Sequence, residues 1–290
     1  MSVNKTTDIT DIAQYLNWAK HCHDVEYGPN DEFTCYQRNI YFRGQASTSW
    51  NLIPSIFRKQ GDIYEEHRIF QRACNMLWNE LIDCKSALEK LIRLQHYGLH
   101  TRLLDVTYNP LVALYFACQS VTDSNCDKDG IVYSGHLDVN EIKVSMAIAE
   151  YIVNHDTTDI HDNIIELLCK QFSCKRESLN EIQLIEPPYN SKRINAQKGA
   201  FIVSPLLNDK DAAPFNYAKY SDISEQMKSA FCKECIIRQQ YKTTILEELD
   251  SIGINKATVF MDISSILDYI NEKKDNEWKL ADCNYDSILT

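Results

Sequence analysis

Long apolar runs are missing from this sequence. Its most apolar stretch, residues 111–118, is far shorter than the roughly 18–20 residues needed to cross a bilayer. The N-terminus does not combine a basic start with an apolar run, as a secretory signal does. Low-complexity segments and fixed-period repeats are also missing. We therefore expect a cytoplasmic protein with no membrane segment, folded as one domain over residues 1–290.

The cysteines support neither a disulfide framework nor a zinc site. There are 11 of them, an odd number, and several lie in helical apolar patterns, where a free thiol packs as a small hydrophobe. Cys232 and Cys235 form a CxxC, but a tetrahedral zinc site needs a second pair of ligands at comparable spacing. We expect reduced thiols and no metal.

Positive charge is in deficit. The chain has 30 Lys and Arg against 41 Asp and Glu, and its formal net charge is −11. Nucleic-acid binding depends on clustered Lys and Arg, so this balance argues against attraction over the whole surface. A local basic cleft remains compatible with it.

Short strands and separated helices follow one another along the chain. Hydrophobic periodicity predicts helices at residues 8–19, 64–81, 85–97, 111–120, 242–249 and from 263 onward, and strands at residues 39–43, 101–106, 130–137, 183–186, 199–203 and 235–238. A loop is expected at residues 27–32 and a helical insertion at about residues 140–180. The mixture favours an α+β fold, with a compact core of short strands surrounded by helices.

Two helix boundaries are marked by particular residues. Gly98 is expected to end the helix at residues 85–97, because glycine readily adopts the left-handed conformation of a C-terminal cap. Asn109 and Pro110 are expected to open the next helix, because a proline in the first turn loses no hydrogen bond.

Three segments place polar residues where strand patterning predicts a half-buried environment. They are YFRGQ with Arg43, Gly44 and Gln45; LQHYGLHTRLLDVTYNP with His96, His100, Arg102, Asp105 and Thr107; and RINAQKGAFIV with Arg193 and Gln197. On a strand, Arg43 and Gln45 point to the face opposite Gly44, which would let a ligand approach the backbone. Arginines brought together by strands would bind phosphate or carboxylate, because guanidinium is a rigid fork of donors.

Structural explanations of the same residues are equally open. Asp105 can be the partner of Arg102 in an ion pair that closes a turn, or part of the loop leading to the Asn109–Pro110 cap. His96 and His100 are separated by the expected cap glycine, so the pattern does not place them on one face.

These segments, taken in order, resemble the bacterial FRG domain, named for Phe-Arg-Gly. The similarity joins YFRGQ, WNLIPSIFR, QHYGLHTRLLDVTYNPLVALYFA, RINAQKGAFIV and LEELDSIGINKATVF, from about residue 35 to 270. The chain departs from the pattern at Val106, where an aromatic is common, and at Met261 and Asp262, where Pro-Asp usually follows a final strand. The family's prophage and mobile-element neighbourhoods imply a toxin or phage-defence role, with a macromolecular target and an antitoxin or defence-system partner.

A more remote resemblance is to the ADP-ribosyltransferase fold, and it implies a split sheet and NAD as substrate. That fold holds NAD on a strand ending in Arg-Gly. A second strand with hydroxyl residues leads into an Ala- and Phe-rich helix, and a last strand bears Glu. The resemblance implies catalytic roles for Arg43, Asp105, Thr107 and Gln197, and NAD binding by Arg43, Gly44, Gln45, Arg102, Tyr108, Tyr115 and Arg193. Tyr108 or Tyr115 would stack on nicotinamide.

The resemblance meets one chemical difficulty. Breaking the nicotinamide–ribose bond develops positive charge on the ribose, so a nearby carboxylate is expected. Gln197 stands near the place of the usual Glu and carries no charge. Either Asp105 supplies the carboxylate, or the site is a non-catalytic nucleotide- or anion-sensing module. A hydrolase or nuclease with His96 or His100 as general base, oriented by Asp105, is a third hypothesis.

Overall fold

The computed structural model describes residues 7–26, 40–59, 62–120, 128–137, 142–156, 160–187, 191–206 and 220–277. In chain order the elements are β1 (Thr7–Ile9), α1 (Ile12–Glu26), β2 (Ile40–Gln45), η1 (Ser55–Phe57), η2 (Asp62–Glu65), α2 (Glu66–Met76), α3 (Trp78–Leu81), α4 (Ala87–His96), β3 (Leu103–Thr107), α5 (Pro110–Ala117), β4 (Gly130–His136), α6 (Ile142–Asn154), α7 (Asp162–Phe172), η3 (Glu177–Asn180), β5 (Gln183–Ile185), α8 (Lys192–Gln197), β6 (Gly199–Val203), α9 (Tyr220–Ser229), β7 (Lys233–Ile237), α10 (Gln239–Ser251), α11 (Lys256–Phe260) and α12 (Ile263–Glu277). The loop expected at residues 27–32 lies outside the described residues. Within these ranges no helix combines the length and the apolar character needed to cross a membrane.

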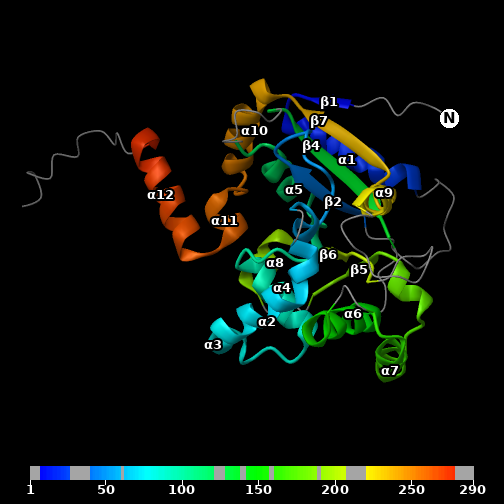
Figure 1. Cartoon of the computed structure of the whole chain (residues 1–290). Coiled ribbons are helices and arrows are strands. Elements are labelled where there is room, and N and C mark those ends of the chain that lie inside the picture. Colours follow the sequence, from blue (N-terminus) through cyan, green and yellow to red (C-terminus); the bar gives the residue numbers. More distant parts are fainter. Residues whose placement is uncertain are drawn as a thin grey trace, which may run out of the picture.

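One seven-stranded sheet runs through the middle of the molecule, in the order β1-β7-β4-β2-β3-β6-β5 (Figure 1). β1 and β7 are parallel, and the other neighbouring strands are antiparallel. The expected mixed fold of short strands surrounded by helices is confirmed. β1 was not predicted, because its three residues overlap the helical pattern that begins at residue 8.

The sheet is weakly joined at its centre. β2 pairs with β4 through six residues and β3 pairs with β6 through five. Between β2 and β3, in contrast, the described strands register a single pair, Phe42 opposite Thr107. The C-terminal half of β2 therefore has no backbone partner on the β3 side. This opening is called the β2–β3 seam below.

Two groups of helices cover one face of the sheet, one group on each side of the seam. α1, α5 and α10 pack on β2, β4 and β7, around residues such as Phe42 and Val132. α2, α4, α6 and α8 pack on the β3 side, around residues such as Leu103 and Phe201. Figure 1 shows α1 and α10 at one end of the molecule and α2 and α6 at the other. The seam lies between the two groups.

The opposite face is covered by residues 52–57, Ile63 and α9. Tyr41 and Leu104 pack there against Leu52, Phe57 and Met227. α9 was not among the helices predicted from hydrophobic periodicity.

Glycines let α5 lie directly on two strands. A Cβ atom on Gly44 would come within 1.8 Å of the carbonyl oxygen of Ala113, and one on Gly130 within 2.1 Å of that of Ala117. The space above Gly44 is thus filled by the backbone of α5. This corrects the expectation that Gly44 serves the approach of a ligand, although its backbone borders the cavity described below.

Local capping explains several helix boundaries. Gly98 has φ 95° and ends α4, as predicted. Asn109 opens α5, also as predicted, by accepting the N–H of Leu111 on its Oδ1 at 3.0 Å. The helix predicted at residues 64–81 is divided into η2, α2 and α3, with a break at Leu77, where the backbone leaves helical geometry (φ −108°, ψ 30°).

The described residues between 142 and 180 are mostly helical, as predicted, but α6 is part of the core. Its Ile148, Tyr151 and Ile152 are fully buried, and the helix packs on α2 and α4. This segment is therefore a core layer with α7 packed outside it.

Residues 256–260 form a helix, which corrects the expectation of a final strand there. Asn255 accepts the N–H of Thr258 on its side chain at 3.0 Å, and Thr258 Oγ1 accepts the N–H of Asn255 at 3.0 Å. This reciprocal capping box stabilises the start of α11. Figure 1 shows α12, in red, projecting from the body beyond α11.

Candidate functional site

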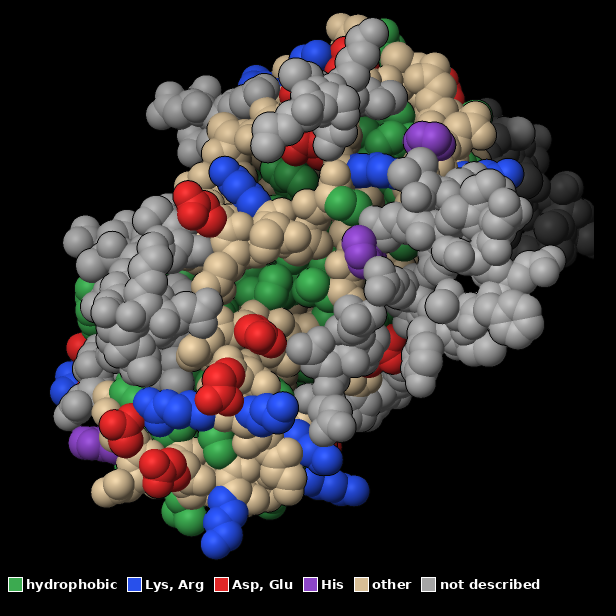
Figure 2. All heavy atoms as spheres, turned by 90° about the vertical axis from the view of Figure 1, so that its right-hand side faces the viewer, with side chains coloured by type: hydrophobic (Ala, Val, Ile, Leu, Met, Phe, Trp, Pro, Cys, Tyr) green, Lys and Arg blue, Asp and Glu red, His purple; other side chains and the backbone are tan. Residues whose placement is uncertain are grey.

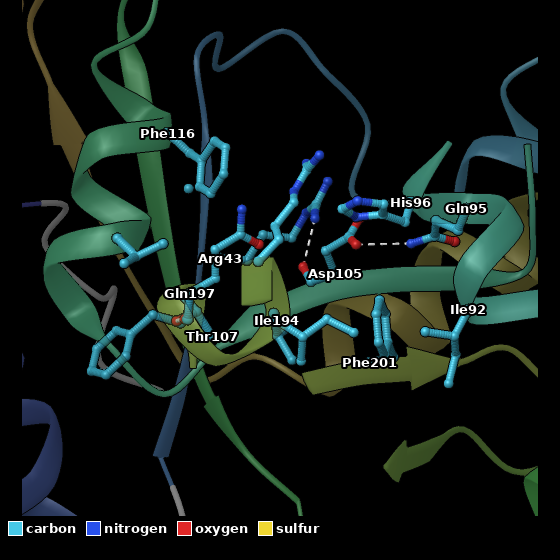
Figure 3. Close-up of a pocket in the computed structure, with 15 residues that line it drawn as sticks. Arg43, Ile92, Gln95, His96, Asp105, Thr107, Phe116, Ile194, Gln197 and Phe201 are labelled. Atoms are coloured by element: carbon cyan, nitrogen blue, oxygen red, sulfur yellow. Dashed lines mark hydrogen bonds between the residues drawn. The ribbon is translucent and has the colours of Figure 1, made fainter. Parts of the chain in front are cut away.

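A cavity of about 260 Å³ opens at the β2–β3 seam, between the two groups of helices. It is lined by Phe42, Arg43, Gly44, Ile92, Gln95, His96, Asp105, Val106, Thr107, Val112, Phe116, Arg193, Ile194, Gln197 and Phe201. It is called the seam pocket below. Of the residues that the sequence predicts for a site, it brings together Arg43, Gly44, Asp105, Thr107, Arg193 and Gln197 (Figure 3).

Arg43 reaches the seam pocket through the opening in the sheet. On β2 it alternates to the face opposite Gly44, as predicted, and lies opposite Tyr133 of β4. Its Nη1 donates to the main-chain oxygen of Asp105 at 2.6 Å, where β2 and β3 register no backbone pair. In Figure 3 the guanidinium lies between the rings of Phe116 and His96. The arginine therefore fills part of the seam and presents charge to the pocket.

The charge of Arg43 has little compensation. Its Nε is buried and has no hydrogen-bond partner among the described residues. Burial lowers the pKa of Arg43 to about 10, an effect that Asp105 opposes and Arg58 reinforces. The group remains a cation at neutral pH.

Asp105 is the acidic residue among those lining the seam pocket. Its side chain is exposed, and Oδ1 accepts a hydrogen bond from Gln95 Nε2 at 2.9 Å. Gln95 is held in turn, because its Oε1 accepts the hydroxyl of Thr101. Within the described part of the chain Asp105 forms no ion pair. The carboxylate is thus positioned by the neutral amide of Gln95 and is not engaged by a cation of the described residues at ion-pair distance.

Arg102 lies in the core, away from the seam pocket. Its Nε and Nη2 donate to the carboxylate of Glu66 at 2.7–2.9 Å, and its Nη1 donates to the oxygen of Pro205 at 2.6 Å. The side chains of Arg102 and Glu66 are 0% and 4% exposed. All three guanidinium nitrogens are engaged. This corrects two expectations, that Arg102 anchors an anion and that it pairs with Asp105.

Arg193 supplies the second cation of the seam pocket. It lies on α8, one turn before Gln197, so both side chains face the same way. Its guanidinium carbon is 4.7 Å from the centre of the Phe260 ring, a cation–π contact. Burial lowers the pKa of Arg193, while Asp105 and Asp262 raise it. No carboxylate of the described residues lies within ion-pair distance of this guanidinium.

Thr107 and Gln197 tie the floor of the seam pocket together. Thr107 Oγ1 donates to the main-chain oxygen of Gln197 and accepts the N–H of Asn109 at 2.9 Å. Gln197 Nε2 donates to the oxygen of Val259 at 3.2 Å. These hydrogen bonds join β3, α8 and α11, so both residues stabilise the packing of these elements in addition to any contact with a ligand.

Three predicted residues lie away from the seam pocket. Gln45 is buried on the opposite face of the sheet, where its Nε2 donates to the oxygen of Asn51 at 3.4 Å. Tyr108 packs in the core of that same face. Tyr115 is buried in the core around α5. The aromatic ring that lines the pocket is Phe116, which no sequence signal distinguishes because α5 is apolar on all sides.

The end of α4 contributes Gln95 and His96. Gln95 was missed, although a half-buried amide in the last turn of an amphipathic helix, three residues before the cap glycine, is a signal that could have found it. Burial and the nearby Arg193 lower the pKa of His96, which favours its neutral imidazole. His100 lies elsewhere, with Nδ1 2.8 Å from Asp62 Oδ2. The hypothesis that His100 acts together with Asp105 is therefore wrong.

Metal-ligating side chains do not cluster in the part of the chain that the structure describes. No group of three or more His, Cys, Asp or Glu there could hold a metal ion. The CxxC thiols have different surroundings, since Cys235 is buried and Cys232 is exposed. On the face shown in Figure 2, side chains of both charges lie interspersed, without one broad basic area. Two arginines, Arg43 and Arg193, instead line the seam pocket.

The fold and the site together define a class of protein. It is a mixed α/β protein whose single sheet opens at its centre into a pocket with two arginines and one carboxylate. Residues 38–126 match the FRG domain family model, so this segment is similar to the FRG domain family. The match runs from before β2 to beyond α5, so it contains Arg43, Asp105 and Thr107, and Arg193 and Gln197 lie beyond it. No curated protein and no solved structure matches the chain.

Proposed function

We propose that the seam pocket binds a phosphate-bearing nucleotide, with NAD as substrate, and that the protein is an ADP-ribosyltransferase-like effector of a toxin or phage-defence system. The observation that carries this proposal is the convergence of Arg43, Arg193 and Asp105 where the sheet opens. Removing a cation from water costs desolvation free energy unless a nearby negative charge compensates it. A bound phosphate would do so for both arginines.

The donors in the pocket suit such a ligand. Buried polar atoms in folded proteins nearly always have a hydrogen-bond partner, and Arg43 Nε has none among the described residues. A phosphate oxygen would satisfy it, since guanidinium binds phosphate through two parallel bonds. The ring of Phe116 offers an apolar surface to the remainder of the ligand.

The seam also supports the ADP-ribosyltransferase-like interpretation. That resemblance implies a split sheet, and β2 is joined to β3 by one registered pair beside Arg43. It also requires a strand with a hydroxyl residue that leads into an apolar helix. Thr107 ends β3 three residues before α5 begins.

In the proposed reaction the bond between the ribose and nicotinamide breaks, nicotinamide leaves, and the ribose carbon forms a bond to a nucleophile on a macromolecular target. Arg43 and Arg193 would hold the phosphates. Asp105, fixed by Gln95, would stabilise the positive charge that develops on the ribose. Gln197 is neutral and would contribute hydrogen bonds alone.

The test is nicotinamide release from NAD by the purified protein in the presence of cell lysate. We expect Arg43→Ala to reduce release by about 100-fold or more, because it removes a preorganised cation. Arg68→Ala is the matched control: its side chain is 74% exposed and pairs with Glu65 alone among the described residues. Unfolding curves of both variants verify the fold. Full release by Arg43→Ala would overturn the proposal.

A non-catalytic nucleotide- or anion-sensing module is the second candidate. Gln197 favours this function, because it is neutral and stands near the position of the Glu that the ADP-ribosyltransferase fold carries on its last strand. The pocket lining also contains a single acidic side chain, Asp105. Calorimetry distinguishes the two functions. Binding of NAD that Arg43→Ala abolishes, without any release of nicotinamide, would identify a sensing module.

A further inference from the structure

A second cavity, of about 230 Å³, adjoins the seam pocket. It is lined by Glu89, Ile92, Arg93, His96, Tyr97, Pro187, Ser191 and Ile194. Ile92, His96 and Ile194 also line the seam pocket, so the two hollows share a wall built from α4 and α8. The second one is called the α4 pocket below.

The two pockets differ in chemistry. The seam pocket has two arginines and an aspartate, whereas the α4 pocket has an apolar wall made by Ile92, Pro187 and Ile194. Arg93 brings no uncompensated charge to it. Its guanidinium pairs with Asp83 and also donates to the oxygen of Glu80 at 2.8 Å. Glu89 adds one carboxylate, whose Oε2 accepts the N–H of Lys85 at 2.8 Å. The α4 pocket therefore suits a group without negative charge.

Two rings stand at the α4 pocket. The centroids of His96 and Tyr97 are 5.6 Å apart, with the ring planes at 61°. Tyr97 is 53% exposed, because α4 ends there and Gly98 turns the chain away. An exposed aromatic ring beside an apolar hollow is a surface on which a flat heterocycle stacks.

We propose that the α4 pocket holds the base of the nucleotide whose phosphates bind Arg43 and Arg193. The inference rests on the proposed function, because it takes the anion site as given. Each hollow alone is smaller than the roughly 300–1,000 Å³ of most small-molecule sites, and the two together fall within that range. The expected ligand is thus charged at one end and aromatic at the other, with His96 between the two.

Calorimetry of the full chain with ADP and with inorganic pyrophosphate tests this. Both probes carry a diphosphate, and only ADP carries a base. We expect ADP to bind about tenfold more tightly or better, from stacking. Tyr97→Ala should reduce ADP affinity toward that of pyrophosphate and leave pyrophosphate affinity unchanged. Tyr64→Ala, an exposed tyrosine that lines neither hollow, should change neither affinity.

A second variant keeps the test decisive if Tyr97→Ala disturbs α4. Ser191→Trp adds a bulky side chain to the α4 pocket, and Ser191 makes no side-chain cap bond to α8 that would be lost. It should reduce ADP affinity in the same way.

The outcomes separate the two proposals. If neither probe binds, the anion site fails and the proposed function with it. Equal affinity for both probes would leave the anion site standing and overturn the base subsite. A preference for ADP that survives both Tyr97→Ala and Ser191→Trp would place the base elsewhere and also overturn the subsite.

Discussion

Three arginines with the same chemistry have three different surroundings in this protein. Arg43 spans the seam and donates to a main-chain oxygen. Arg193 lies over the ring of Phe260. Arg102 is enclosed with Glu66 in the core. Arg102 differs from the other two because a carboxylate of the same chain neutralises its guanidinium.

At this scale we expect Arg102→Leu to destabilise the fold by about 3–5 kcal/mol, because it leaves the carboxylate of Glu66 buried without a partner. Pyrophosphate affinity of the folded protein should not change. Urea unfolding gives the free energy of unfolding, and calorimetry gives the affinity.

The double variant Arg102→Leu with Glu66→Leu is the control. It removes both buried charges and should recover most of the lost stability. Loss of pyrophosphate affinity in Arg102→Leu, with stability unchanged, would show instead that Arg102 belongs to the site.

At the scale of elements, the crossing of α5 over β2 and β4 positions the wall of the seam pocket. The crossing is close because Gly44 and Gly130 have no side chains to separate the helix from the strands. α5 in turn carries Val112 and Phe116 into the pocket. The glycine of the Phe-Arg-Gly tripeptide therefore acts on the site through packing, while the arginine acts on it by charge.

We expect Gly44→Ala to lower the free energy of unfolding by about 1–3 kcal/mol, since the new methyl group would overlap the oxygen of Ala113. Gly199→Ala is the matched control on β6. Its Cβ would meet nothing closer than 3.7 Å, so its effect should stay within about 0.5 kcal/mol. Equal unfolding midpoints for the two variants would show that α5 moves to accommodate the methyl group without loss of stability.

At the scale of the whole molecule, the sheet has two halves, each covered by its own group of helices and joined at the seam by one registered pair. The chain has a net charge of −11, but two arginines, Arg43 and Arg193, line the pocket at this seam. A phosphate bound there would contact residues of both halves. Phosphate binding should therefore stabilise the pairing of the two halves of the sheet.

Hydrogen exchange with and without pyrophosphate measures this link. We expect the ligand to slow exchange in β2 and β3 together, and to raise the free energy of unfolding by about 2.7 kcal/mol at a hundredfold excess over Kd. Arg43→Ala should abolish both effects. Protection confined to one half of the sheet would show that the ligand does not span the seam.

The sequence by itself determined the features that depend on neighbouring residues. Gly98 ends α4 because glycine tolerates a positive φ, and Asn109 with Pro110 opens α5 by local capping. β6 occupies the residues predicted for it, at Gly199–Val203. The residues of the charged site were also readable, since Arg43, Asp105 and Arg193 stand out as polar groups in half-buried segments. α11 was missed even though its capping box is local.

Only the tertiary structure decided which of these residues meet. Arg102 is separated from Glu66 by 36 residues and from Pro205 by 103, and Arg43 from Asp105 by 62. No local pattern states such pairings, because they depend on how strands and helices pack. For the same reason Gly44 proved to accommodate α5, and Phe116 rather than Tyr108 or Tyr115 lines the pocket. Residue types supply the charges, and long-range packing decides which charges are left for a ligand.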